Sequence, residues 1–123
     1  MGESENLIAN NIKKIPGLKL KKIFIIGLSD TCFTIAKILK NLGCELYAYA
    51  SDDIIAINRY NKDNTIFSEK YFCGDIDLVI KILEFDEAVL IPDSVYLIAS
   101  DHYEKKLLAL NFKKNINYCR VER

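Results

Sequence analysis

The segment 22–50 constrains the fold of this chain more than any other part of it. Residues 22–27 (Lys-Ile-Phe-Ile-Ile-Gly) form a continuous apolar run that ends in glycine, which is typical of a strand buried on both faces of a parallel sheet. Residues 30–42 then show helical periodicity, and Gly43 stands where the end of a helix needs a left-handed residue. Residues 45–50 form a second short strand. Together these elements predict a βαβ unit.

The rest of the chain continues the alternation of helices and strands. We expect three further helices, over 54–60, 76–85 (with Asp75 as its cap) and 101–111, short extended pieces within 65–73, and a final edge strand over 116–121. Such alternation favours helices packed on both faces of a parallel sheet. The sequence therefore predicts an α/β fold, a Rossmann-like three-layer domain with a mainly parallel sheet.

Two apolar runs compete for the strand that precedes the last helix. The run at 95–99 is favoured, and the alternative places the strand at 87–91 and begins the helix at Ser94. Both runs are short and apolar, and Pro92-Asp93 separates them, so periodicity does not decide between them.

The N-terminal segment has a different character from the rest. Residues 4–15 place Leu7, Ile8, Ile12 and Ile15 at helical spacing, and Pro16-Gly17 ends the helix. We expect an N-terminal helical arm over 1–18, which packs on the main body or faces a partner, followed by a single α/β domain over 19–123.

Composition narrows the functional classes. The 123 residues leave room for one domain, so an enzyme with a separate substrate domain would need another subunit or chain. Lysine plus arginine equals aspartate plus glutamate, 17 each, which argues against a general nucleic-acid binder. The local cluster of Lys19, Lys21 and Lys22, with Lys13 and Lys14 upstream, is interpreted as a solvated lead-in to the first strand.

The cysteine spacing and the hydropathy of the chain predict the cellular compartment in which the protein works. Cys32, Cys44, Cys73 and Cys119 form no C-x-x-C pair, so we expect no metal site and no dithiol redox motif. No signal peptide and no apolar run of about 20 residues is recognised, so we expect a cytoplasmic protein without a membrane span.

Ligands of such sheets bind at the carboxyl ends of the strands, where three loops of this chain are expected to meet. In the first loop, Gly27 is the one glycine of a dinucleotide fingerprint that is present, because Ser29 and Cys32 occupy the other two glycine positions. Ser29 and Thr31 offer hydroxyl donors beside a helix N-terminus, whereas Asp30 adds a charge that repels anions. The alternative is that Gly27 serves only the geometry of the turn.

The second and third loops carry acids, a serine and the single histidine. Asp52 and Asp53 follow the second strand, where a carboxylate can bind ribose hydroxyls or cap the next helix. Ser100 and His102 follow the strand at 95–99, and His102 is either a surface residue or a proton-transfer group working with Asp101 or Tyr103. We therefore predict a ligand site of Gly27, Ser29, Thr31, Asp52, Asp53, Ser100 and His102, and no catalytic residue is assigned.

The run 22–27, the helix to Gly43 and the strand leading into Asp52-Asp53 resemble the N-terminal Rossmann-like domain of bacterial nucleotide-sugar acyltransferases of the sialic-acid and bacillosamine type and of related polysaccharide-biosynthesis proteins. The segment 95–103 is also similar to that family. The resemblance covers roughly residues 20–112 and implies a domain that binds the nucleotide of a UDP-sugar through the first loop and the acid after the second strand. The family's catalytic β-helix has no counterpart here, because no hexapeptide repeat is present.

These observations favour two alternative functions. The first is a nucleotide or nucleotide-sugar binding module, non-catalytic alone and related to surface-polysaccharide biosynthesis, which works as a homo-oligomer or with a larger enzyme partner. The alternative is an interaction or regulatory scaffold whose nucleotide site has decayed, with an exposed apolar patch on helix 4–15 or on the edge strand 116–121. A small enzyme that uses His102 and a ligand-sensing transport subunit remain further possibilities, because fold alone does not separate these functions.

Overall fold

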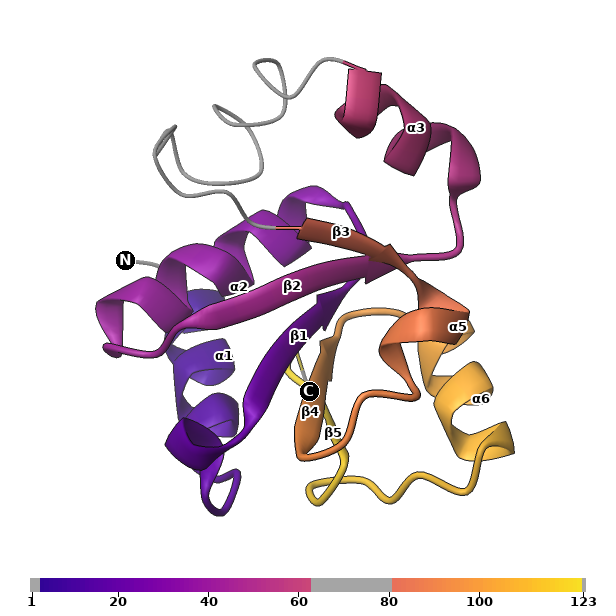
Figure 1. Ribbon diagram of the computed structural model, residues 1–123. Coiled ribbons are helices and arrows are strands. Elements are labelled where there is room, and N and C mark those ends of the chain that lie inside the picture. Colours follow the sequence, from indigo (N-terminus) through magenta and orange to yellow (C-terminus); the bar gives the residue numbers. More distant parts are fainter. Residues whose placement is uncertain (1–2, 63–80, 123) are drawn as a thin grey trace.

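The computed structural model describes residues 3–62 and 81–122, and these form a parallel sheet covered by helices (Figure 1). The five strands are β1 (Lys22–Ile26), β2 (Leu46–Ser51), β3 (Lys81–Glu84), β4 (Ser94–Ile98) and β5 (Tyr118–Arg120). Their order in the sheet is β3-β2-β1-β4-β5, and every neighbouring pair is parallel. The predicted α/β fold with a parallel sheet is thus confirmed.

The helices occupy both faces of the sheet. They are α1 (Glu3–Lys13), the 3-10 turn η1 (Leu18–Leu20), α2 (Asp30–Asn41), α3 (Ile54–Lys62), α5 (Phe85–Ala88) and α6 (Asp101–Ala109). In Figure 1, α1 and α2 cover one face, while α5 and α6 lie on the other. Alternating residues of β1 show why its apolar run is continuous: Ile23 and Ile25 face the core under α1 and α2, whereas Phe24 and Ile26 face the core under α5 and α6.

The βαβ unit forms as its sequence predicts. Gly43 adopts φ +74°, and the backbone N–H of Cys44 donates to the carbonyl of Leu39 at 2.9 Å, while the N–H of Gly43 donates to Lys40 at 3.1 Å. This pair of bonds is a Schellman motif, which satisfies the last carbonyls of α2. The chain then turns directly into β2.

The N-terminal helix packs against the sheet. Ile8, Ile12 and Ile15 are buried in the same core as α2, and the side-chain amide of Asn11 donates to the carbonyl of Val121 at 2.8 Å, which ties α1 to the end of β5. Helix α1 therefore covers the half of this face that α2 leaves open. Its apolar stripe is largely used in the core, although Leu7 stays 43% exposed.

Around β4 one expectation is confirmed and another is wrong. The strand is Ser94–Ile98, which agrees with the favoured run at 95–99 and not with 87–91. The predicted helix over 76–85 is wrong for its described part, because residues 81–84 form β3 and pair with β2. Ile82 and Leu83 pack on opposite faces of the sheet, so β pairing satisfies apolar side chains that had suggested a helical face. The pieces expected in 65–73, Asp75 and residues 76–80 lie outside the described residues.

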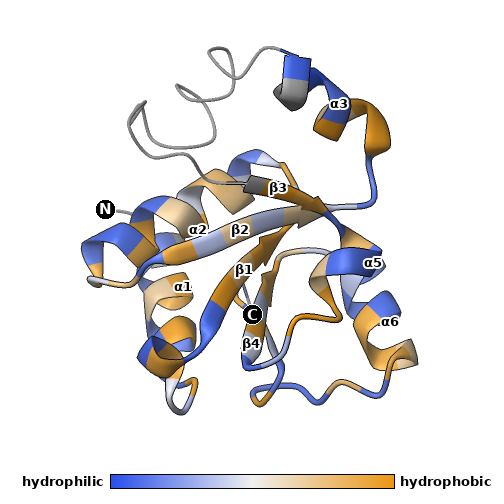
Figure 2. Cartoon of the chain, in the orientation of Figure 1, coloured by the Kyte–Doolittle hydropathy of each residue, from blue (hydrophilic) through white to orange (hydrophobic). Residues whose placement is uncertain are grey.

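Sequence hydropathy follows these layers (Figure 2). The strands are mostly apolar where they lie between the helices, whereas the loops mix polar and apolar residues, with a hydrophobic stretch between α5 and β4. No helix in the described ranges has the length and apolarity needed to cross a bilayer.

Candidate functional site

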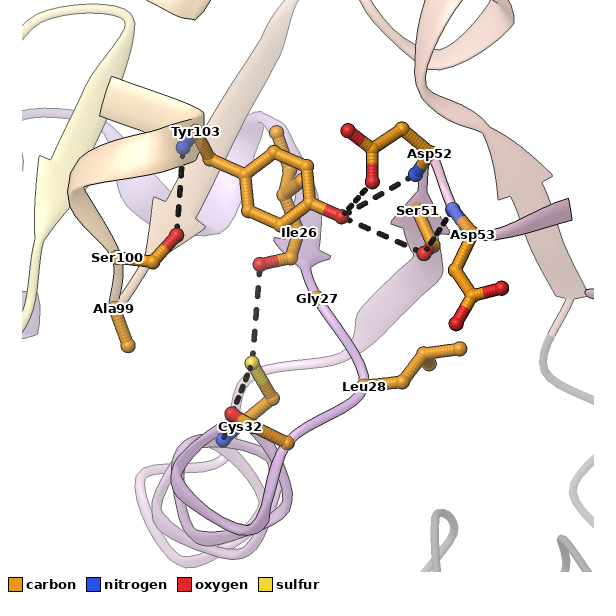
Figure 3. A pocket seen from close by; sticks show the side chains of 11 residues that line it. Ile26, Gly27, Leu28, Cys32, Ser51, Asp52, Asp53, Ala99, Ser100 and Tyr103 are labelled. Carbon is orange, nitrogen blue, oxygen red and sulfur yellow. Dashed lines mark hydrogen bonds between the residues drawn. The ribbon is translucent and has the colours of Figure 1, made fainter. Parts of the chain in front are cut away.

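A pocket of about 370 Å³ opens at the carboxyl edge of the sheet, beside the point where the strand order reverses between β1 and β4 (Figure 3). Loops that follow β1, β2 and β4 all contribute to its wall. The lining residues are Ile26, Gly27, Leu28, Ser29, Cys32, Ser51, Asp52, Asp53, Ala99, Ser100 and Tyr103. Open parallel sheets place their ligands at this topological position.

The β1–α2 loop is shaped by Gly27 and held by Ser29. Gly27 has φ +121°, and a Cβ atom added to it would lie 3.0 Å from the Sγ atom of Cys32 and 3.5 Å from the ring of Tyr103. Glycine is thus required here both by its backbone angle and by its neighbours. Ser29 is the N-cap of α2, since its hydroxyl accepts a hydrogen bond from the backbone N–H of Cys32 at 3.4 Å.

Cys32 fills the place that the third fingerprint glycine would leave open. Its thiol lies 3.8 Å from the carbonyl of Ile26, to which it donates, and accepts from the Ser29 hydroxyl at 3.3 Å. Burial raises the pKa of this thiol above its ordinary value, so Cys32 stays protonated at neutral pH. The side chain is therefore a packing element of the loop, and its chemistry does not suit a nucleophile.

The two acids of the β2–α3 loop, Asp52 and Asp53, make different hydrogen bonds. Asp53 caps α3, because its Oδ1 atom accepts from the backbone N–H of Ala56 at 3.1 Å. The N–H of Asp53 donates in turn to the buried hydroxyl of Ser51 at 2.9 Å. Asp52 caps nothing, and its carboxylate reaches across the pocket mouth to α6.

Three side chains of α6 hold Asp52. The hydroxyl of Tyr103 donates to Oδ1 at 2.9 Å, whereas Nε2 of His102 and Nζ of Lys106 lie 2.5 Å and 3.2 Å from Oδ2. Burial alone would raise the pKa of Asp52, but the hydrogen bonds from these residues outweigh it and lower the pKa to about 2. Asp52 is therefore ionised throughout the neutral range. We call Asp52 with these three residues the aspartate cluster.

Tyr103 contacts both the end of β2 and the β1–α2 loop. Its hydroxyl also accepts from the backbone N–H of Asp52 at 3.2 Å and lies 3.4 Å from the Ser51 hydroxyl. Its ring packs beside Gly27 and stacks on Phe85 with centroids 5.9 Å apart. Burial raises the pKa of Tyr103, so its hydroxyl stays protonated and can donate. Figure 3 shows the Tyr103 side chain reaching from α6 toward Asp52 and Ser51.

The structure brings five of the seven predicted site residues to the pocket. These are Gly27, Ser29, Asp52, Asp53 and Ser100, the last of which caps α6 by accepting from the N–H of Tyr103 at 3.3 Å. Thr31 is exposed on α2 and does not line the pocket. His102 is also outside the lining, with 61% of its side chain exposed, and meets the site only through Asp52.

Sequence reasoning missed Ser51 and Lys106 and treated Tyr103 only as a partner of His102. A usable signal existed in α6, where His102 and Lys106 are four residues apart and so share one face of the helix. Two basic side chains on one face suggest an acid opposite them. The sequence does not say which acid, because Asp52 lies fifty residues away along the chain.

A second polar cluster lies on the other flank of α6. Arg120 of β5 has a side chain only 6% exposed, and its guanidinium pairs with Asp101, with Glu104 Oε1 at 3.3 Å and with Glu122 Oε1 at 2.6 Å. Hydrogen bonding to Asp101 is the main cause of the raised pKa of Arg120. Tyr118 donates its hydroxyl to Glu104 Oε2 at 3.0 Å. We call Arg120 with its three carboxylates the arginine cluster.

The pocket combines apolar side chains with carboxylates and hydroxyl groups. Asp52 and Asp53 are hydrogen-bond acceptors, Ser29, Ser51 and Ser100 are neutral, and α2 and α6 both begin at the pocket edge. Within the described ranges, no group of three histidine, cysteine, aspartate or glutamate side chains could hold a metal ion.

Comparison of the chain with protein-family models, with curated proteins and with solved structures found no match. The resemblance to the acyltransferase domain therefore stays a prediction from the sequence.

Proposed function

We propose that this chain is a small-molecule binding module, non-catalytic alone, which takes the nucleoside part of a nucleotide or nucleotide-sugar in the pocket at the carboxyl edge. The observation that carries the proposal is the placement of this pocket at the switch point of a β3-β2-β1-β4-β5 sheet, with an acid-bearing loop at the end of β2. Acids at that position can accept hydrogen bonds from ribose hydroxyls.

The volume of the pocket suits one part of a nucleotide-sugar, the nucleoside, rather than the whole molecule. Ligand pockets span about 300–1,000 Å³, so the 370 Å³ here lies near the lower end of that range. A nucleoside fits such a volume, and a sugar-phosphate would extend beyond the pocket mouth. The nucleotide-sugar class and the link to surface-polysaccharide biosynthesis come from the sequence resemblance, and a larger enzyme or a second subunit would then complete the site.

Asp53 is the acid that is better placed to act on a ligand. Among the described side chains none bonds the Asp53 carboxylate, whose Oδ1 atom caps α3, whereas both oxygens of Asp52 accept from α6. Ligand recognition through Asp53 leaves the aspartate cluster intact. The pocket then needs no rearrangement of α6 to bind a hydroxyl-bearing molecule.

Thermal-shift screening of the full chain against UDP, UDP-sugars, NAD and adenine nucleotides tests the proposal, with hits measured by isothermal titration calorimetry. Asp53→Asn keeps a capping side chain but removes the charge, and we expect about a tenfold or greater loss of affinity because a hydrogen bond to a charged group is lost. Asp93→Asn is the matched control, since Asp93 precedes β4 at the opposite edge of the sheet. A flat response to the whole panel contradicts the proposal.

The aspartate cluster favours a second candidate, the interaction scaffold with a decayed nucleotide site. Asp52 is committed to Tyr103, His102 and Lys106, and the two other glycines of the fingerprint are absent. Under this alternative the acids at the end of β2 serve folding alone. Static light scattering discriminates, because a scaffold without a ligand site is expected to self-associate or to bind a protein while ignoring every nucleotide.

A further inference from the structure

A lysine-rich surface lies at the amino edge of the sheet, opposite the pocket. Residues 13–22 lead into β1 and residues 111–117 lead into β5, and Lys21 Nζ joins the two segments by donating to the carbonyl of Ile116 at 3.2 Å. We call the two segments together the basic face. Every charged residue in it is a lysine: Lys13, Lys14, Lys19, Lys21, Lys22, Lys113 and Lys114.

Each segment of the basic face presents an apolar side chain to solvent. Leu20 is 90% exposed, the largest exposed fraction among the large apolar residues of the described chain, and Ile116 is 51% exposed. Leu18 is buried and anchors the η1 turn, while Gly17 begins the turn with φ +66°. Figure 1 shows both loops projecting from the end of the sheet where β1 and β4 begin. The leucine is thus held out on a structured projection.

A hollow beside the projection is suited to an anionic group. It has a volume of about 540 Å³ and lies between the η1 turn and the start of β2. Lys19, Lys21 and Lys22 contribute to its wall, together with Tyr47 and a single acid, Glu45. Lys22 Nζ lies 5.7 Å from the centre of the Tyr47 ring. The positive charge thus surrounds a space rather than a flat surface.

Charge on the described residues is biased along the strand direction although the whole chain is neutral: the basic face carries seven lysines, and Glu45 and Asp93 are acids near the same edge. The acids near the pocket follow strand ends or begin helices at the carboxyl edge: Asp30, Asp52, Asp53, Asp101 and Glu122. Part of this bias reflects helix dipoles, which favour acids in first turns and bases in last turns. Lys19 of η1 and Lys113 and Lys114 lie outside the α-helices, so helix dipoles do not account for them.

We propose that the basic face docks the protein on an anionic phospholipid surface, with Leu20 and Ile116 inserted at the level of the headgroups. Lysines around exposed apolar side chains combine the two attractions that hold proteins at such surfaces. An acidic protein would also match the charge of the lysines, and competition by soluble poly-glutamate distinguishes that occupant from a phospholipid surface. Docking in this orientation turns the pocket at the opposite edge toward solvent.

Co-sedimentation of the full chain with vesicles tests this inference. We expect binding to vesicles of equal parts phosphatidylglycerol and phosphatidylcholine, no binding to pure phosphatidylcholine, and weakening as salt is raised. Lys19→Gln and Lys113→Gln are each expected to lower the partition coefficient about fivefold, since a lysine near such a surface contributes about that factor. Leu20→Ser is expected to lower it about tenfold.

Matched controls separate docking from general effects. Lys62→Gln and Ile55→Ser change exposed residues of α3, outside the basic face, and are expected to leave the partition coefficient unchanged. Circular dichroism of each variant checks that it is folded. The inference is overturned if the protein ignores anionic vesicles at low salt. It is equally overturned if Leu20→Ser has no effect while soluble poly-glutamate or a nucleic acid competes fully, because the face is then a general polyanion site.

Discussion

The two polar clusters that flank α6 have opposite charge arrangements. In the aspartate cluster a single carboxylate accepts from three donors of α6, and a third of its side chain remains exposed. In the arginine cluster a buried guanidinium is surrounded by carboxylates, two of which, Asp101 and Glu104, belong to α6. Helix α6 therefore presents hydrogen-bond donors to the end of β2 and carboxylate acceptors to the end of β5.

Because of this difference, we expect the aspartate cluster and the arginine cluster to contribute unequally to the stability of the fold. Exposed ion pairs contribute about 0–1 kcal/mol because water and salt screen them, whereas removing one partner of a buried pair costs about 3–5 kcal/mol. We infer that the arginine cluster fixes α6 on the sheet. The aspartate cluster, of which Asp52 and Tyr103 line the pocket, holds the β2–α3 loop with weaker interactions.

The largest effect is expected from Arg120→Met. It removes the buried cation and leaves Glu104 and Glu122 without their charge partner, so the free energy of unfolding should fall by about 3 kcal/mol in urea denaturation. Arg59→Met, an exposed arginine of α3, is the control. Combining Arg120→Met with Glu104→Gln should restore part of the loss. A loss below about 1 kcal/mol for Arg120→Met, typical of an exposed pair, would mean that the two flanks do not differ.

Tyr103→Phe comes next, because one hydroxyl serves Asp52 Oδ1, the Asp52 N–H and Ser51. We expect a loss of about 1–2 kcal/mol in the same assay, since partly buried polar groups lose their partner. Tyr47→Phe is the matched control, because Tyr47 is 47% exposed. If the hydroxyl acts through Asp52, Tyr103→Phe should cost less in an Asp52→Asn background. Full additivity of the two substitutions would contradict a shared cluster.

The aspartate cluster should also give the protein an acid-sensitive contribution. The pKa of Asp52 is about 2 in the folded chain against an ordinary value of 3.8, so its stabilisation is complete above about pH 4 and is lost as the pH falls toward 2. After allowance for solvent screening we expect about 1 kcal/mol. Urea titrations across this range should show that Asp52→Asn flattens the pH dependence relative to Asp53→Asn. An equal slope in both variants would remove Asp52 as its source.

His102→Asn should have the smallest effect. The imidazole is 61% exposed, and Lys106 and Tyr103 still hold Asp52 when it is gone, so we expect a change within about 0.5 kcal/mol. Thermal unfolding at neutral pH is sufficient to measure it. If His102→Asn costs as much as Tyr103→Phe, the imidazole has a larger share in the cluster than its exposure indicates.

The elements that the sequence predicted well are those whose signals are local. The apolar run of β1, the helical period of α2 and the left-handed Gly43 each depend on neighbouring residues, and the structure has each of them as expected. The segment 81–84 was mispredicted as part of a helix over 76–85, because Leu83 fits the helical spacing of that segment and also fits a strand. The free edge of β2 decides their conformation, and that edge is not visible in the local sequence.

For the candidate site, too, the sequence predicted what depends on local signals and missed what depends on contacts between distant segments. Gly27, Asp52 and Ser100 could be placed at one edge because the carboxyl ends of parallel strands meet there. The tasks of the two acids could not be separated, because a cap and a cross-chain partner look alike in sequence. Asp53 bonds a backbone three residues away, whereas Asp52 bonds side chains about fifty residues away.

The α/β architecture, the turn at Gly27 and lysine as the one charged residue type before β1 and β5 follow from residue type and short-range order. The pairing of Asp52 with α6, the burial of Arg120 among acids and the shared face of Leu20 and Ile116 follow from the packing of the elements. The physical reason is that charge pairing and exposure depend on distances in space. Strand order and helix packing set those distances, and separation along the chain does not.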